Sequence, residues 1–253
     1  MKSNPKFASI PDGINEGIRS AKQFTMLSLL GNPRSSYSSD CQPITNLALK
    51  KLIVIEDVGP FMVTGIKPAV DDLRDIFKAV ESSNPDLYSS IGTAGMLCCR
   101  LVRGSNHAIS NHAWGTAIDL KINGVLDNRG DNKVLESLAI LAPFFNKHGW
   151  FWGAGFRTED SMHFEVGEER IREFHAAGFF GKNIVAPDRV LNLGDRGLEV
   201  AQLQKKLNEF GASMEVDGIY GVATRAEIIS FQAANGLVPD GIVGHATAAS
   251  LGL

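Results

Sequence analysis

Residues 110–119 have the sequence SNHAWGTAID, which places His112 seven residues before a carboxylate, Asp119. Apolar and polar side chains alternate over residues 118–122, which predicts a β-strand with Asp119 and Lys121 on one face. Gly115 and the small Ala117 allow a turn between His112 and this strand. The stretch therefore brings an imidazole and a carboxylate within reach of each other.

A second histidine and carboxylate segment follows at residues 159–165, with the sequence EDSMHFE. Residues 162–166 predict another strand, on which His163 and Glu165 share a face. Two imidazoles, one ligating carboxylate and one spare carboxylate meet the needs of a hydrolytic zinc site. The two segments together predict a metallohydrolase.

The spare carboxylate has a chemical task in such a site. Zinc lowers the pKa of a bound water towards about 7, and a nearby base must move the water's proton to the leaving amine. Asp160, three residues before His163, is placed for that task, and Glu159 is the competing candidate. Glu165 is a candidate hydrogen-bond partner for a zinc-binding histidine.

The two segments resemble the M15 family of zinc peptidases, which includes D-Ala-D-Ala carboxypeptidases and bacteriophage L-alanyl-D-glutamate endopeptidases. Residues 110–119 match the family pattern Ser-x-His-x-x-Gly-x-Ala-x-Asp, and residues 160–165 match acid-x-x-His-Phe-Glu. Residues 149–153, GWFWG, resemble the family's aromatic segment. The similarity spans roughly residues 95–166.

This resemblance implies Zn²⁺ as the cofactor and Asp160 as the catalytic base, with the metal ligands His112, Asp119 and His163. The family also has an arginine upstream that polarises the scissile carbonyl or holds a substrate carboxylate. Arg100 is preferred for this role, because Cys99-Arg100 resembles a Cys-Arg pair of extensin-like domains, and Arg103 is the alternative. Ser110 and Trp152 are further candidates for contact with substrate.

Residues 190–253 predict a second, all-α domain of three short helices, after a linker at residues 183–189 that includes Pro187. A segment beginning Asp-Gly at 217 recurs at 240, a period of 23 residues, and each copy precedes a helical pattern. Residues 199–210 predict an amphipathic helix, and Thr224 with Glu227 predicts a capping box. With LGDRG at residues 193–197, this domain resembles peptidoglycan-binding three-helix modules.

Residues 1–182 predict a catalytic domain of the α+β class, in which helices accompany an antiparallel sheet. Helices are expected over residues 67–82 and 134–147, the second bent or broken at Pro143. Strands are expected over residues 52–55, 62–63, 95–103, 118–122, 150–152 and 162–166. His107 is expected in an exposed loop and His148 at a helix C-terminus.

The composition excludes several function classes. A net charge of −3 without a run of lysines or arginines argues against a nucleic-acid-binding surface. The longest apolar run, residues 138–145, is far shorter than the roughly 20 residues that span a bilayer, so no membrane insertion is expected. Because no secretory signal is evident, we expect a cytoplasmic location in the producing cell. An odd cysteine count, Cys41 with the adjacent Cys98 and Cys99, favours free thiols, although a bridge from Cys41 stays open.

Together these features predict a monomeric, zinc-dependent peptidase whose partner is bacterial peptidoglycan. A phage endolysin that cuts the stem peptide as an endopeptidase, and reaches the wall or periplasm after release, is the preferred interpretation. The wall-binding module would tether the enzyme to its substrate. Two alternatives stay open: a D-Ala-D-Ala carboxypeptidase of wall remodelling, and a non-catalytic wall-binding protein with a vestigial metal site.

Overall fold

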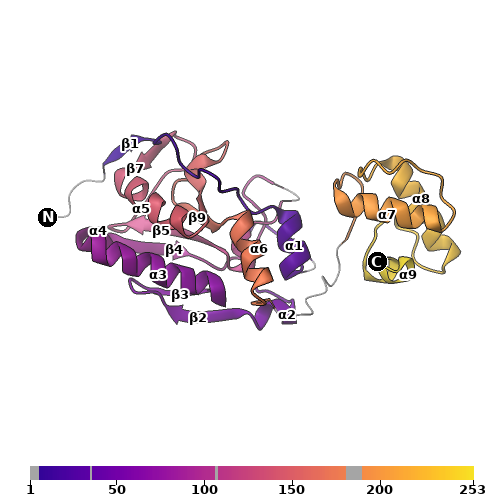
Figure 1. Ribbon diagram of the computed structural model, residues 1–253, viewed down its shortest axis with the longest axis horizontal. Coiled ribbons are helices and arrows are strands. Elements are labelled where there is room, and N and C mark those ends of the chain that lie inside the picture. The colour runs from indigo at the N-terminus through magenta and orange to yellow at the C-terminus, as the bar shows by residue number, and fades with distance from the viewer. Residues whose placement is uncertain (1–5, 35, 106–107, 181–189) are drawn as a thin grey trace. The chain divides into compact units, whose positions relative to one another are not determined.

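The computed structural model describes residues 6–34, 36–105, 108–180 and 190–253, and the chain divides into two compact units, Met1–Val185 and Ala186–Leu253 (Figure 1). The expected linker at 183–189 and the loop residue His107 lie outside the described residues. In the described ranges, no helix has both the length and the apolarity to cross a membrane. Each unit is described by itself.

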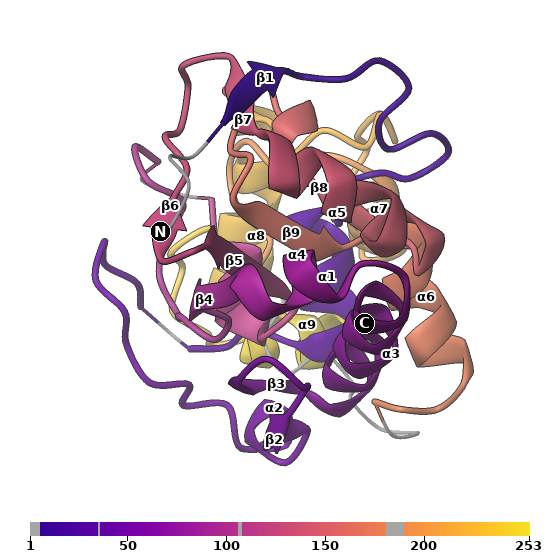
Figure 2. The same ribbon diagram turned by 90° about the vertical axis from the view of Figure 1, so that its left-hand side faces the viewer.

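The first unit is built on a five-stranded antiparallel sheet in the order β4-β5-β9-β8, with β6 added to β5 (Figure 2). Alternation along β5 and β9 directs Ile118 and Phe164 into the core and Asp119 and His163 to the opposite face. The strands are β4 Ile91–Gly95, β5 Ala117–Ile122, β6 Val125–Leu126, β8 Trp150–Trp152 and β9 His163–Val166.

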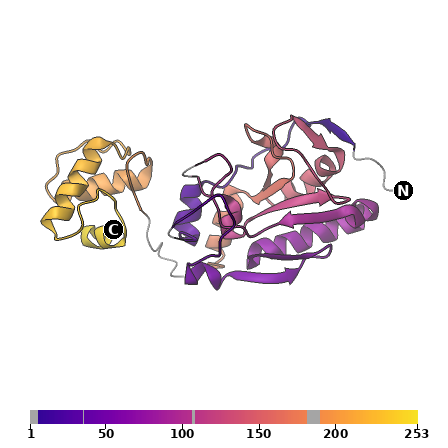
Figure 3. The same cartoon turned by 180° about the vertical axis from the view of Figure 1, so that it is seen from behind.

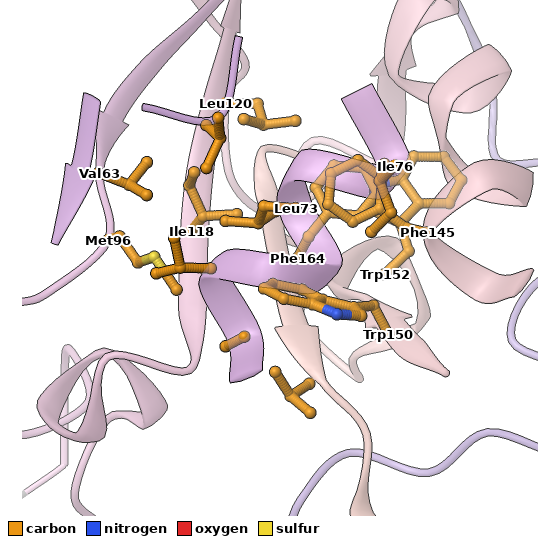
Figure 4. Close-up of a cluster of buried hydrophobic side chains, with 14 of the residues drawn as sticks. Val63, Leu73, Ile76, Met96, Ile118, Leu120, Phe145, Trp150, Trp152 and Phe164 are labelled. Atoms are coloured by element: carbon orange, nitrogen blue, oxygen red, sulfur yellow. The ribbon is translucent and has the colours of Figure 1, made fainter. Parts of the chain in front are cut away.

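Helix α3 Lys67–Ser83 covers the sheet with an apolar face that includes Leu73 and Ile76, both fully buried. It lies between the sheet and the hairpin of β2 Ile53–Asp57 and β3 Met62–Ile66 (Figures 1 and 3). Helix α5 Glu136–Lys147 adds Phe145, whose ring packs against the rings of Phe164 and Trp150 (Figure 4). This aromatic cluster packs against one face of the sheet and holds β8 and β9 in place.

The remaining elements of the first unit tie its edges together. Helix α6 contributes the buried Glu168, which accepts hydrogen bonds from the Lys22 backbone N–H at 2.9 Å and from the Thr25 hydroxyl at 2.6 Å, both at the start of α1. Strands β1 and β7 pair in a separate ribbon. The bounds are β1 Phe7–Ser9, α1 Gln23–Leu30, α2 Leu47–Lys50, α4 Pro85–Ser90, η1 Asn111–Trp114, β7 Lys133–Leu135, η2 Gly153–Gly155 and α6 Glu168–Ala176.

The α+β class is confirmed, and helix α3 follows the predicted helix over residues 67–82. The strand expected over residues 95–103 is wrong, because β4 ends at Gly95 and Cys99 and Leu101 form only isolated bridges. Gly95 has a φ of 127°, a conformation that breaks a strand and favours glycine. Pro143 lies inside α5, which continues to Lys147.

The expectation of free thiols is wrong for two of the three cysteines. Cys41 and Cys98 form a disulfide, with Cα atoms 5.0 Å apart, and Cys99 is a buried free thiol. The bridge forms because two segments far apart in sequence lie side by side, with the Gln42 N–H donating to the Cys99 carbonyl at 3.0 Å. Burial raises the pKa of the Cys99 thiol to about 11, so this neighbour is a poor nucleophile for exchange with the bridge.

Removing this bridge should destabilise the protein. The disulfide joins residues 57 positions apart, so its loss in Cys41→Ser frees a long loop in the unfolded chain. The expected loss is about 4 kcal/mol in the free energy of unfolding, measured by urea denaturation. A reducing agent should lower the wild type to the level of the variant and leave the variant unchanged. A wild-type curve insensitive to reduction would contradict a stabilising bridge.

The second unit consists of α7 Leu198–Glu209, α8 Val222–Ala234 and α9 His245–Leu251 around its own apolar core. Leu203 of α7, Ile228 of α8 and Leu251 of α9 are buried together with Tyr220, whose hydroxyl donates to the Gly241 carbonyl at 3.1 Å. The three expected helices are thus present among the described residues 190–253.

The repeated Asp-Gly segments are held by a duplicated hydrogen-bond network. The buried Gln204 amide donates to Asp217 at 2.7 Å and accepts from the Gly218 N–H at 2.8 Å. In the second copy Gln232 donates to Asp240 at 2.9 Å and accepts from the Gly241 N–H at 2.9 Å. The glutamine of each copy also donates to a threonine, Gln204 to Thr224 and Gln232 to Thr247. The aspartate, glycine and threonine of the two networks thus repeat with the 23-residue period of the sequence, whereas the glutamines that bind them are 28 residues apart.

The capping box expected from Thr224 and Glu227 is wrong. Helix α8 begins at Val222 after Gly221, so Thr224 lies inside its first turn. The buried Thr224 hydroxyl donates to the Ile219 carbonyl at 3.1 Å and accepts from Gln204. The Thr224 hydroxyl is therefore engaged in contacts with Gln204 and Ile219 instead of capping the helix.

Replacing Gln232 with alanine should destabilise the second unit, because the buried Gly241 N–H and the Thr247 hydroxyl each lose a partner. Buried groups left without partners cost about 1–3 kcal/mol each, so we expect a loss of about 2–3 kcal/mol in the free energy of unfolding, read from the melting transition of this unit. The matched control is Gln202→Ala, which changes an exposed glutamine of α7. Equal effects of both substitutions would contradict a structural role for the network.

Candidate metal centre

The site is built on one cross-strand pair. Asp119 of β5 lies directly opposite His163 of β9 in the antiparallel register. Opposed residues on one face of such a pair have Cβ atoms about 5 Å apart. The reverse faces of the same strands are anchored by the fully buried Ile118 and Phe164, so the pair has a rigid base.

His112 reaches the pair from the short helix η1, which immediately precedes β5. The turn back into the strand occurs at Gly115, which has a left-handed φ of 67°. A side chain there would place a Cβ 2.8 Å from the Cα of Gly65, in the hairpin strand β3. The glycine of the motif is therefore needed for both the backbone conformation and the close packing.

The three side chains converge on one point. The distance from His112 Nε2 to His163 Nδ1 is 3.2 Å, and Asp119 Oδ1 lies 3.2 Å from the former and 3.1 Å from the latter. Among the described residues they form the one set of three or more histidine, cysteine or acidic side chains able to hold a metal ion. Both imidazoles are buried, and Asp119 is partly exposed.

The other nitrogen of each ring has a fixed partner. His112 Nδ1 lies 2.7 Å from the Met96 carbonyl, an acceptor, and His163 Nε2 lies 2.9 Å from the Glu165 carboxylate. When such a ring is neutral, the outer acceptor keeps the proton on the outer nitrogen, and the inner nitrogen then directs a lone pair at the shared point. Two lone pairs beside a carboxylate oxygen repel one another unless a cation lies between them, so this donor set fits a divalent metal.

Glu165 is itself held by two further side chains. It is 3% exposed, and it accepts hydrogen bonds from Ser20 Oγ at 2.5 Å and from Asn111 Nδ2 at 2.9 Å. Burial raises the pKa of Glu165, but the hydrogen bonds with His163, Ser20 and Asn111 outweigh it and lower that pKa overall. The orienting role expected for Glu165 thus has a geometric basis, and Ser20 comes from a region that sequence analysis left unassigned.

The electrostatics of the pocket favour positive charge. Burial raises the pKa of Asp119, but its hydrogen bonds with the two histidines outweigh this and hold the pKa well below its usual range. Burial lowers the pKa of His163, but hydrogen bonds with Asp119 and Glu165 reverse this and raise it to about 10. The carboxylates therefore stabilise a cation at the point where the three donors meet.

Asp160 and Glu159, the two candidate bases, have different surroundings. Burial raises the pKa of Asp160, and the nearby Asp119 carboxylate adds to the effect. Glu159 is 2% exposed and turns away to accept the backbone N–H groups of Gly130 at 3.0 Å and Asn132 at 2.9 Å. Asp160 is thus the carboxylate that lies within the electrostatic environment of the donors.

Gly153, at the end of the aromatic segment, fixes the turn that contains Asp160. The Asp160 N–H donates to the Gly153 carbonyl at 3.0 Å, and the His163 N–H donates to the Asp160 carbonyl at 3.1 Å. A Cβ at Gly153 would lie 2.5 Å from the Asp160 carbonyl oxygen. The glycine therefore allows the candidate base and the candidate ligand to pack closely.

The two candidate arginines differ in exposure. Arg100 is partly buried and donates to the Leu101 carbonyl at 2.9 Å. Burial and the charge of Arg103 lower the pKa of Arg100, while Asp119 and Asp160 act to raise it. Arg100 is therefore within the field of both site carboxylates, whereas Arg103 is exposed.

The placement of Ser110 and Trp152 does not fit direct contact with substrate. Trp152 is fully buried, its indole N–H donates to the Ser161 carbonyl at 2.7 Å, and its ring stacks on Phe164. The expected contact with substrate is wrong for Trp152, because its buried ring packs against strand β9. Ser110 is 6% exposed and its N–H donates to the Arg100 carbonyl at 3.1 Å, so it links the arginine segment to η1.

Neither sequence motif indicates Arg129, whose Nε lies 3.4 Å from Asp160 Oδ2. Arg129 comes from the loop after β6, ten residues beyond Asp119 and outside both motifs. Its nearest signal in the sequence is the polar stretch DNRGDN at residues 127–132, which is typical of any exposed loop.

Comparison with known families agrees with this geometry. Residues 103–166 match the M15 family model described as D-alanyl-D-alanine carboxypeptidase, and residues 196–251 match the model described as a putative peptidoglycan binding domain. Both resemblances expected from the sequence are thereby confirmed. The first match contains all three metal-donor residues and Asp160.

Individual relatives match over limited segments. A zinc D-Ala-D-Ala carboxypeptidase of Streptomyces albus G is 43% identical over 60 residues, which are 22% of this chain and 24% of the relative. The crystal structure of Burkholderia AP3 phage endolysin matches at 49% identity and a TM-score of 0.25, over 25% of this chain and 24% of that one. A peptidoglycan-binding protein from Clostridioides difficile matches at 35% identity and a TM-score of 0.26, over 27% of this chain and 43% of that one. The chain thus spans about a quarter of the curated relative.

Proposed function

We propose that this protein is a zinc-dependent peptidase that cleaves peptide bonds in bacterial peptidoglycan. The observation that supports the proposal most strongly is the convergence of His112, Asp119 and His163 on one point, with Asp160 beside it. The family matches add the substrate class, because the peptidase segment and the peptidoglycan-binding segment are associated with the same polymer.

The residues of the site have separate roles in the proposed hydrolysis. His112, Asp119 and His163 would hold a zinc ion, which when bound would supply Lewis acidity for activating water and the scissile carbonyl. Asp160, with a raised pKa and an oxygen free to accept, takes the proton of the attacking water and passes it to the amine of the leaving fragment. Arg100 supplies positive charge for the developing oxyanion or for a substrate carboxylate.

The second unit would hold the enzyme on the wall. Its own fold and core are complete without the first unit, and tethering raises the local concentration of bonds to be cut. We infer that the protein acts as an endolysin of phage type, at the cell wall after release, and cuts the stem peptide internally as a monomer.

Chelation and readdition of metal test this function on purified peptidoglycan. We expect EDTA to abolish the release of peptide fragments and Zn²⁺ to restore it, with the cut bond identified by mass spectrometry of the products. Fragment release that is undiminished after complete removal of metal would refute the proposal.

A D-Ala-D-Ala carboxypeptidase is the second candidate, favoured by the description of the matched family and by the Streptomyces relative. The same digestion separates the two, because a carboxypeptidase releases only free D-alanine, whereas an endopeptidase shortens the stem peptide at an internal bond. A protein that binds zinc and peptidoglycan but releases neither product would instead be a non-catalytic wall-binding protein.

A further inference from the structure

The loop of residues 127–132 is fastened at its base by a buried carboxylate, Asp127, which is 3% exposed. Asp127 accepts hydrogen bonds from the backbone N–H groups of Asn128 at 2.8 Å and Leu135 at 2.7 Å. It also accepts one from the hydroxyl of Ser161, the residue after Asp160. The base of the loop is therefore attached to the segment that contains the candidate catalytic base.

A second buried carboxylate, Glu159, fastens the far side of the same loop. One of its oxygens accepts the N–H groups of Gly130 and Asn132, and its backbone carbonyl accepts the Gly130 N–H at 2.9 Å. Burying two carboxylates is costly unless they are well paired. Both carboxylates accept hydrogen bonds from backbone N–H groups of one short loop, Glu159 through Oε2 alone, since its buried Oε1 has no partner among the described residues. This use of two buried carboxylates indicates that the conformation of the loop is specified.

Arg129 is the residue that this loop directs towards the site. Its side chain is 35% exposed, and its Nε lies 3.4 Å from Oδ2 of Asp160, whose side chain is 24% exposed. The other carboxylate oxygen of Asp160, Oδ1, is buried and has no hydrogen-bond partner among the described residues. The two oxygens of the base are thus different, because Oδ2 is paired with a cation and Oδ1 is buried without a hydrogen-bond partner among the described residues.

We propose that Arg129 is a positioning residue that holds Asp160 by Oδ2, so that Oδ1 stays turned to receive the proton during hydrolysis. This inference rests on the proposed peptidase function. A carboxylate with no partner can rotate among several orientations, and small errors in the placement of a catalytic group cost large factors in rate. The buried carboxylates Asp127 and Glu159 act on Asp160 only indirectly, because they hold the loop that contains Arg129.

Steady-state kinetics of the zinc-loaded full chain test the proposal. The probes are a synthetic stem peptide and its analogue, in which the carboxylate next to the scissile bond is a carboxamide. For Arg129→Gln we expect kcat to fall roughly tenfold to a hundredfold on both peptides with KM unchanged, and Arg129→Lys to recover part of the loss. Glu159→Gln should give a milder form of the same change.

Lys133→Gln is the matched control, because it removes an exposed positive charge just beyond the same loop. A rise in KM confined to the carboxylate peptide would overturn the proposal and make Arg129 a substrate-binding residue. An unchanged kcat for Arg129→Gln would overturn it as well.

Crystal structures of the zinc-loaded wild type and Arg129→Gln provide a readout that does not depend on activity. We expect the Asp160 carboxylate to rotate or to occupy more than one conformer in the variant, whereas an unchanged single conformer would overturn the proposal. A wild type without activity on any stem peptide would refute the peptidase function, and the two structures would still decide whether Arg129 positions Asp160.

Discussion

Asp160→Asn should lower kcat for peptide cleavage by about a thousandfold, within the range of 10²–10⁴ usual for loss of a general acid–base group. The amide has nearly the same shape as the carboxylate but cannot accept the water's proton. Because Asp160 is not one of the three converging donors, zinc content should remain at one ion per chain. The measurements are elemental analysis of the purified variant and steady-state cleavage of a stem peptide.

The matched control for this substitution is Asp75→Asn, at an exposed position of helix α3. It removes the same charge from the surface and should leave turnover unchanged. An active Asp160→Asn variant would contradict the assignment of Asp160 as the base and would require another residue in that role. Glu159 would then have to leave the backbone groups of Gly130 and Asn132 to reach the site.

His163→Ala should remove both metal and activity. The variant loses one of three donors and leaves Glu165, a fully buried carboxylate, without its imidazole partner. Loss of a partner that only orients a metal ligand costs about 10–100-fold in metal affinity, so loss of the ligand itself should cost more than a hundredfold. Isothermal titration with Zn²⁺ gives the affinity, and peptide cleavage should fall below detection.

His148→Gln is the control for the histidine substitution, because His148 follows helix α5 and is not among the converging donors. Its zinc affinity and turnover should match those of the wild type. Zinc binding by His163→Ala at wild-type affinity would contradict the assigned donor set, and a restored affinity in His163→Cys would support it.

The convergence of the candidate metal donors could be expected from the sequence because two of them lie on strands whose side chains alternate between faces. Alternation along residues 118–122 and 162–166 places Asp119 and His163 on the faces of two strands, and the antiparallel register then sets them opposite each other. Periodicity alone could not separate Asp160 from Glu159, since neighbours in a loop have no fixed periodicity, and only the family resemblance favoured Asp160. What separates them is the contact between Glu159 and a loop almost thirty residues earlier.

Long-range contacts also explain the other positions at which the structure differs from the sequence-based predictions. The bridge between Cys41 and Cys98 depends on two irregular segments lying side by side, and no spacing rule foretells such a pairing. Trp152 is a sequence candidate for contact with substrate, but its buried ring stacks on Phe164. Thr224 shows the same conflict, since a buried glutamine competes with the local cap.

The duplicated network of the second unit has a consequence for how that unit unfolds. Helix α8 takes part in both copies, because Thr224 in its first turn belongs to the first network and Gln232 near its end belongs to the second. Melting α8 would remove Gln232 from the second copy and Thr224 from the first, so both copies lose contacts when the helix unfolds. The two similar halves are therefore one cooperative unit, which should lose its structure in a single step.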